Sequence, residues 1–142
     1  MVRYQGQGTG RVFVLGLQRG ELLLESIESL IRAERICDAI LTSAIGSLQK
    51  VVLHRVVGLG REPEDEFITL ERPMELASLQ GMVVDGQPHF HMVVSDTGAA
   101  YTGHLENGTT VLYLAEITLL EVSGLSLARR KNDDNIATLV PR

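Results

Sequence analysis

The stretch from Thr109 to Val122 constrains the fold more than any other, because it is almost continuously apolar and directly follows the dipeptide Asn107-Gly108. Asn-Gly is a strong signal for a tight hairpin, since both residues tolerate a positive φ, so we expect a hairpin here that opens the longest strand. Such an apolar run is typical of a strand that is buried on both faces. Glu116 interrupts the run, and a buried carboxylate needs a partner. An ion pair at a subunit interface, a neighbouring bound cation and exposure at a sheet edge all remain open for Glu116.

Strand and turn signals recur through the rest of the chain. Alternating or short apolar runs rich in β-branched residues predict strands over residues 11–17, 37–45, 48–57, 67–81, 88–96 and 99–105. Asp85-Gly86 is a tight-hairpin signal that leads into residues 88–96. The Gly, Pro and acidic content of residues 58–66 marks a surface loop. The pattern therefore predicts a sheet whose strands are joined mainly by turns and short loops.

One segment has helical periodicity instead. Between about residues 21 and 34, Leu23, Ile27, Leu30 and Ile31 fall on one face of a helix. Many strands with a single amphipathic helix predict an α+β domain, with a largely antiparallel or mixed β-sheet packed against one main helix. One helix covers only part of such a sheet, so we expect another copy of the chain to bury the remaining apolar face.

The length fits one domain with a single core, since the chain has 142 residues. We expect residues 1–10 to form a flexible leader, residues 11–124 the domain, and residues 125–142 a polar and loosely ordered C-terminal tail. Cys37 is the only cysteine, which excludes an intrachain disulfide. Its apolar neighbours predict a small buried side chain rather than a nucleophile.

Charge and hydropathy disfavour two classes of partner. The formal net charge is -5, and the one basic cluster, Arg129-Arg130-Lys131, is followed at once by Asp133-Asp134. Affinity for nucleic acid comes mainly from basic groups that neutralise phosphates, so direct DNA binding is not expected. No apolar run approaches the roughly 18 residues that span a bilayer. The N-terminus also lacks the features of a signal peptide, which predicts a cytoplasmic location.

Three of the four histidines, His89, His91 and His104, lie within sixteen residues of one another. Alternation along a strand directs His89 and His91 to the same face, about 7 Å apart, and His104 is close enough to join them from the adjoining strand. Three neutral imidazoles with one open position suit zinc, although nickel, copper and iron also accept nitrogen ligands. The alternative is that these are polar residues on a solvent-facing strand. We favour a metal site, because the clustering would otherwise be a coincidence.

The remaining histidine, His54, has the apolar neighbours Leu53, Val56 and Val57. We interpret it as a structural histidine at a strand edge rather than a fourth metal ligand. If the site is catalytic, a general base has to lie within hydrogen-bonding reach of a metal-bound water. Asp96, together with Glu75 and Glu116, is the candidate for that role; exposure on a solvated face is the alternative for Glu75.

The order of the motifs resembles the plant and prokaryote conserved (PPC) domain over about residues 11–124. The segments that carry the resemblance are Gly20-Glu21, Ala44–Leu48, Met74–Gly81, Pro88–His91, Gly103–Leu105 and Ala115-Glu116. The resemblance implies a sheet packed with one main helix and assembled as a homotrimer. It also implies that prokaryotic members carrying these histidines bind a metal, usually taken as zinc, and His89, His91 and His104 occupy the matching positions.

In plants the same domain is attached to AT-hook segments, and those proteins bind DNA in the nucleus. This chain has no Arg-Gly-Arg-Pro AT-hook and no basic arm, so the DNA-binding label of the family is not expected to hold for direct contact. We therefore expect a metal-binding, homotrimeric PPC-domain protein with an assembly or regulatory role. The alternative is a zinc-dependent enzyme that acts on a small molecule.

Overall fold

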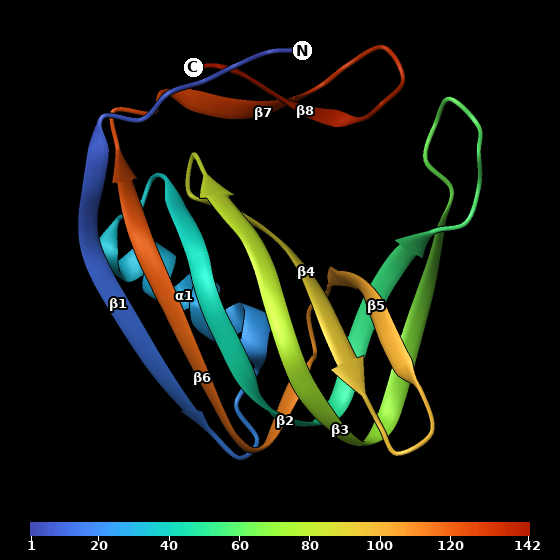
Figure 1. The fold of residues 1–142 in the computed structure, drawn as a ribbon. Helices are drawn as coiled ribbons and strands as arrows, with labels where there is room; N and C mark the ends of the chain where they lie inside the picture. The colour runs from blue at the N-terminus through green and yellow to red at the C-terminus, as the bar shows by residue number, and fades with distance from the viewer.

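A computed structural model describes residues 1–142, which form one large sheet, one helix and a small separate hairpin (Figure 1). The elements are β1 (Gly8–Gln18), α1 (Leu23–Glu34), β2 (Ala39–Val56), β3 (Asp65–Val84), β4 (Gln87–Ser95), β5 (Ala100–Leu105), β6 (Thr110–Ser123), β7 (Leu127–Lys131) and β8 (Ala137–Pro141). Every strand pairing is antiparallel. The predicted α+β class with one helix is confirmed. That helix, α1, is neither long nor apolar enough to cross a membrane.

The six strands of the large sheet lie in the order β1-β6-β2-β3-β4-β5. The final part of β2 also pairs with β5, through Leu53 opposite Leu105 and His54 opposite His104. Because β2, β3, β4 and β5 are thus hydrogen-bonded in a cycle, they form a closed ring at one end of the molecule, visible in the curl of these strands in Figure 1. The other end, made of β1, β6 and the first half of β2, stays open.

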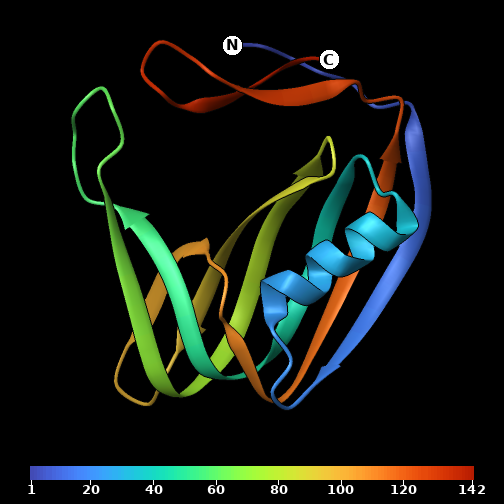
Figure 2. The ribbon, with the colours of Figure 1, turned by 180° about the vertical axis from the view of Figure 1, so that it is seen from behind.

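Helix α1 covers the inner face of the open end, as Figure 2 shows from behind. Its residues Leu23, Ile27 and Ile31 are buried in the same core cluster as Ile117 and Leu119 of β6. Burial of each such side chain contributes about 1.5–3 kcal/mol, so this face fixes the helix against the sheet. The predicted helical face is confirmed, and the helix ends where residue 35 adopts the left-handed conformation, with φ of 53°.

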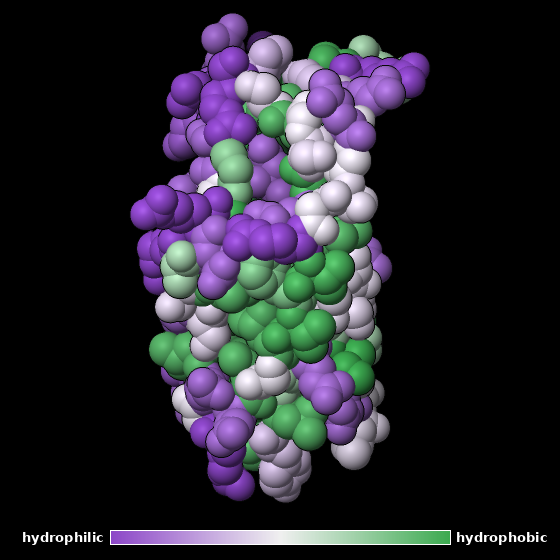
Figure 3. Space-filling model, turned by 90° about the vertical axis from the view of Figure 1, so that its left-hand side faces the viewer, coloured by the Kyte–Doolittle hydropathy of each residue, from purple (hydrophilic) through white to green (hydrophobic).

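Within the single chain the last long strand is buried on one face only, and the burial of its other face by another copy stays a prediction. On β6 the inward residues Val111, Ala115 and Ile117 are fully buried, whereas Leu114 is 50% exposed. The helix covers one face only, which leaves the other bare. We define the outer apolar face as the large hydrophobic side chains exposed on that side: Val12, Val14, Ile40, Ile45 and Leu114. Figure 3, which looks onto the side of β1, shows a band of hydrophobic side chains there.

The turn at Asn107-Gly108 forms, but the hairpin expected there does not. β5 and β6 do not pair with each other; they follow one another along β2, to which both are hydrogen-bonded. The buried Thr109 holds this passage, since its hydroxyl accepts from the amide of Val52 (3.0 Å) and lies 3.1 Å from the carbonyl of the same residue. β6 is also not the longest strand: it has 14 residues, against 20 in β3, because β3 runs on unbroken through Pro73. The tight turn at Asp85-Gly86 is confirmed, with φ of 54° and 72°.

The ends of the domain differ from the expectation in two ways. β1 begins at Gly8, inside the predicted leader, and residues 125–142 contain the hairpin β7–β8 instead of a loose tail. Leu127 and Ala128 anchor the hairpin because both are buried. These contacts are distant in the sequence, so local composition gave no sign of them.

The prediction of a buried cysteine is also wrong. Cys37 is exposed, and its Sγ accepts a hydrogen bond from Nη1 of Arg142 at 2.8 Å. The same guanidinium forms ion pairs with Asp38 (3.2 Å) and Asp85 (2.8 Å). The end of the chain therefore packs over this corner of the sheet and binds the neighbours of the cysteine.

Candidate metal centre

Strand register brings the histidines together on the outer face of the ring, opposite the core. His89 and His91 alternate along β4 with the buried residues Phe90 and Met92. His91 lies directly opposite His104 of β5, and His104 lies directly opposite His54 of β2. The ring closure by β2 and β5 therefore places three imidazoles in a row across three strands.

The four rings form one connected cluster. His104 is at the centre, with its ring centroid 4.6 Å from that of His54, 4.9 Å from that of His89 and 5.5 Å from that of His91. Nε2 of His89 and Nε2 of His91 are 3.2 Å apart. The three predicted ligands are thus neighbours. His54, interpreted from the sequence as a separate structural residue, lies in the same cluster.

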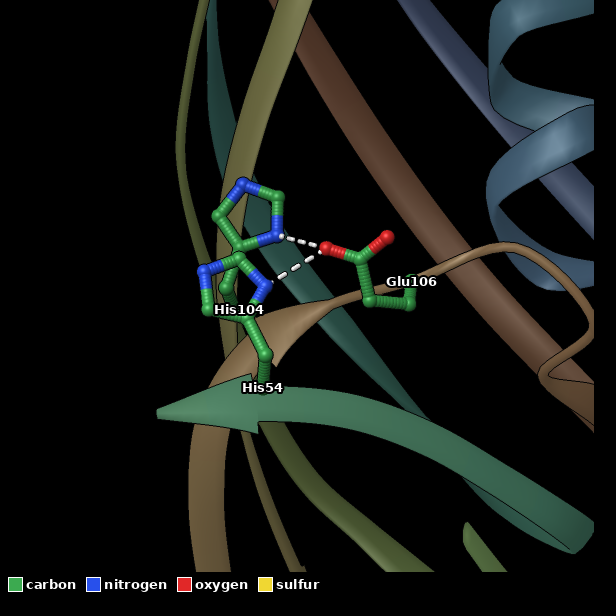
Figure 4. A group of neighbouring side chains, drawn as sticks. All are labelled: His54, His104 and Glu106. Atoms are coloured by element: carbon green, nitrogen blue, oxygen red, sulfur yellow. Dashed lines mark hydrogen bonds and ion pairs between the residues drawn. The ribbon is translucent and has the colours of Figure 1, made fainter. Parts of the chain in front are cut away.

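A carboxylate that the sequence analysis did not identify completes the cluster. Oε1 of Glu106 is 2.7 Å from Nδ1 of His54 and 3.0 Å from Nδ1 of His104 (Figure 4). A carboxylate that accepts from Nδ1–H fixes the tautomer and leaves Nε2 with a free lone pair for a metal. The spacing His104-Leu105-Glu106 carried a usable signal, since residues two apart on a strand share a face.

The donor set fits a metal ion of the zinc type. The potential ligand atoms of His54, His104 and Glu106 all lie within 4.8 Å of one another, and of the three ligands predicted from sequence only His104 belongs to this group. Neutral imidazoles and a carboxylate are among the ligands that Zn²⁺ takes. His89 and His91 also contact His104, so the cluster offers more donor atoms than one tetrahedral ion needs. A metal could be held by His89, His91 and His104, or by His54, His104 and Glu106.

The surroundings keep two of the histidines neutral. Burial lowers the pKa of His89 to about 4, helped by the positive charge of Arg129 and by the other histidines. Burial also lowers the pKa of His91, with further contributions from His104 and His54. Only a neutral imidazole has the lone pair that binds a metal, so these shifts favour the binding form at neutral pH.

A cleft opens directly beside the imidazoles. We call it the histidine cleft: it has a volume of about 580 Å³ and is lined by the four histidines, by Asp65, and by Arg129 and Asn135 of the C-terminal segment. The hairpin β7–β8, expected from sequence to be a loose tail, thus supplies part of the wall. A small molecule in this cleft would lie against both the histidines and Arg129.

The structure does not bring the three predicted general bases to this site. Asp96 accepts from Arg72 (2.7 Å) and from the amides of the following turn, and these hydrogen bonds lower its pKa. Glu75 lines a different pocket together with Asp96. Glu116 is exposed on the outer side of β6, paired with Gly16 and flanked by the outer apolar face. Glu106 is instead the carboxylate in contact with the histidines, and Asp65 lines the cleft beside them.

A model of the Plants and Prokaryotes Conserved (PCC) domain matches residues 4–123. Two curated relatives, each a bifunctional protein GlmU from a Synechococcus strain, are 31% and 30% identical over 115 residues, which is 80% of this chain. The match covers only 18% and 17% of those relatives, so the chain spans less than a fifth of their length.

Several solved structures share the fold along nearly the whole chain. A metal-containing protein from Archaeoglobus fulgidus has a TM-score of 0.85 and 25% identity, covering 99% of both chains. A plant- and prokaryote-conserved protein from Pyrococcus horikoshii has a TM-score of 0.82 and 28% identity, covering 100% of this chain and 99% of the other. A candidate DNA-binding protein from Ralstonia eutropha has a TM-score of 0.74 and 25% identity, covering 98% and 96%.

Proposed function

Because this chain belongs to the Plants and Prokaryotes Conserved domain family, we propose that it is a metal-binding protein whose histidine cluster holds zinc. The observation that carries the proposal is that all four histidines of the chain meet on one face of the ring. Uncharged imidazoles packed together gain little from one another, whereas a shared cation would use their lone pairs. The Archaeoglobus relative is described as metal-containing, which supports a bound metal in this fold.

We assign His89, His91 and His104 as the ligands and Glu106 as the residue that orients His104 and His54. Glu106 accepts from Nδ1 of both rings, which is the arrangement of a carboxylate behind a metal-bound histidine. The competing set is His54, His104 and Glu106 as direct ligands. The two sets differ in whether His91 or His54 is indispensable for metal binding.

Elemental analysis of the purified protein tests this assignment. We expect about one zinc per chain, lost in His91→Ala and retained in His54→Ala. Gln80→Ala is the matched control, since Gln80 is the exposed cross-strand neighbour of His91 on β3. The fold should survive the loss of zinc, because the core is built without it. Loss of zinc in His54→Ala but not in His91→Ala would transfer the site to the competing set.

We further propose that the chain assembles as a homotrimer through the outer apolar face, in an assembly or regulatory role. On this face Val12 is 62% exposed and Val14 is 74% exposed, and a monomer rarely leaves such a contiguous patch in water. An acidic chain with net charge -5 is poorly suited to bind DNA directly. The charge and the exposed apolar face therefore favour contact with protein partners over direct contact with DNA.

The histidine cleft favours one alternative, a zinc-dependent enzyme that acts on a small molecule. A cleft of about 580 Å³ beside the imidazoles has room for a small substrate. Hydrolysis of activated carboxylic and phosphoric esters by the zinc-loaded protein tests this alternative. Turnover that disappears in His91→Ala would support it, and the absence of turnover with every ester would leave the binding role alone.

A further inference from the structure

Arg129 on β7 is the one arginine whose side chain is partly buried without a partner. Its Nε is enclosed and has no hydrogen-bond partner. By contrast, Arg11, Arg55, Arg72 and Arg142 each pair with a carboxylate. Burial lowers the pKa of Arg129, and no neighbouring acid offsets that effect. A guanidinium that is partly removed from water and lacks a counter-ion loses solvation, and a bound anion would offset that loss.

The position of Arg129 indicates that such an anion would lie in the histidine cleft. Arg129 lines the histidine cleft together with all four histidines. Asp65, the other charged residue of the cleft wall, is exposed and forms no ion pair with Arg129. Arg129 is therefore the only basic residue in the wall of the cleft that the four histidines also line.

We propose that the histidine cleft binds a small molecule through a carboxylate or phosphate group, held between Arg129 and the metal at the histidines. This inference rests on the proposed metal site. A guanidinium fork matches two oxygens of such a group, and a dication attracts a third or shared oxygen. The carboxylates of Glu106 and Asp65 do not fully balance a dication and Arg129, so the cleft keeps a positive charge.

The hairpin β7–β8 holds Arg129 in place before any ligand arrives. Its first residues, Leu127 and Ala128, are buried in the protein. Near the other end, the hydroxyl of Tyr4 donates to the carbonyl of Leu139, the cross-strand partner of Arg129, at 3.0 Å. Because both strands of the hairpin are attached, the backbone that carries Arg129 is held beside the cleft before a ligand binds.

The test uses the full chain loaded with cobalt(II), whose visible absorption changes when a ligand enters its coordination sphere. Metal content is measured first, and then inorganic phosphate and acetate are titrated separately into wild type, Arg129→Gln and Arg130→Gln. Arg130 is the matched control because it is the adjacent, exposed residue of β7. We expect Arg129→Gln to weaken binding of the preferred anion about ten-fold or more, Arg129→Lys to restore part of it, and Arg130→Gln to change nothing.

The outcomes separate this inference from the metal site. Tighter binding of phosphate or of acetate by wild type than by Arg129→Gln would support the inference, and the anion bound more tightly would identify the ligand group. Metal-loaded wild type that binds neither anion, or equal affinity in wild type and Arg129→Gln, would overturn the inference and leave the metal site intact. A protein that takes up no metal would overturn both proposals.

Discussion

At its open end the sheet turns valine, isoleucine and leucine outward, and at its closed end it turns four histidines outward beside the exposed Phe67 and Val93. The inner faces do not differ in this way, since Ile117 at one end and Met92 at the other are both fully buried in one core. The fold requires only the apolar inner faces. The outer residues are therefore free to serve function, which fits the proposed assembly at the open end and the proposed metal binding at the closed end.

The two ends also differ in how their strands are supported. The open end depends on α1 for its inner face and has β1 as an edge, whereas the ring closes on itself through the β2–β5 pairing. Closure fixes the register of the three strands that carry the histidines, so the imidazoles sit on a rigid scaffold. The proposed difference between the two ends can be tested by pairs of substitutions, one at the residue of interest and one at a control residue.

The largest effect is expected from charge at the open end. Val14→Asp places a carboxylate in the outer apolar face, and because burying an unpaired charge is costly, we expect the proposed trimer not to form in this variant. Val93→Asp is the control, since Val93 is exposed on β4 at the closed end. Light scattering after gel filtration measures the mass. A Val14→Asp protein of unchanged mass would remove the assembly role from this face.

The next effect is expected at the ring closure. Gly103→Ala adds a Cβ that would collide with the carbonyl of His54 and lie 2.8 Å from Cδ1 of Leu53. We expect the free energy of unfolding to fall by about 1–3 kcal/mol and metal affinity to fall with it. Gly98→Ala, in the turn before β5, meets only an ordinary contact at 3.5 Å and serves as control. Urea unfolding that gives equal stability for both variants would contradict a tightly closed ring.

A smaller effect is expected from the carboxylate behind the histidines. Glu106→Gln removes the charged acceptor shared by His54 and His104, and we expect zinc affinity to fall about 10–100-fold. Glu116→Gln, at the open end, should leave zinc affinity unchanged. Competition with a chromophoric chelator measures both. Unchanged affinity in Glu106→Gln would show that the contact does not support the metal.

The smallest effect concerns pH in the metal-free protein. His89 has a folded pKa of about 4, below its ordinary value of 6.5. As pH falls below about 6.5, the unfolded chain takes up a proton that the folded protein does not, so the free energy of unfolding should decrease until about pH 4. His89→Gln should flatten this dependence. Denaturant unfolding across this range measures it, and equal slopes in both proteins would place His89 in a more hydrated site.

Local patterns predicted the parts of the molecule that depend on near neighbours. The helix face with Leu23 and Ile27, the turn at Asp85-Gly86 and the alternation of His89 and His91 with core residues are confirmed. The family resemblance is confirmed by the match over residues 4–123. Each of these signals needs only a few adjacent residues, or their order along the chain.

Features that depend on distant pairing were missed. His54 joins the cluster only because β2 pairs with β5, which places it opposite His104, 50 residues later in the sequence. Nothing in the sequence around His54 indicates this pairing. Asn107-Gly108 makes a turn, but β2 rather than β6 takes the edge of β5. Arg129 reaches the cleft because its hairpin is attached by contacts with residues far back in the sequence. Composition alone described that segment as a polar tail.

Anomalous diffraction at the zinc absorption edge, from crystals of the purified protein, tests the division of the molecule most directly. The account predicts one strong peak per chain at the histidine cleft, adjacent to His91 and His104, in molecules packed about a three-fold axis through the outer apolar face. Absence of a peak at the histidines, or a three-fold contact made by the ring with the outer apolar face left in solvent, would contradict it.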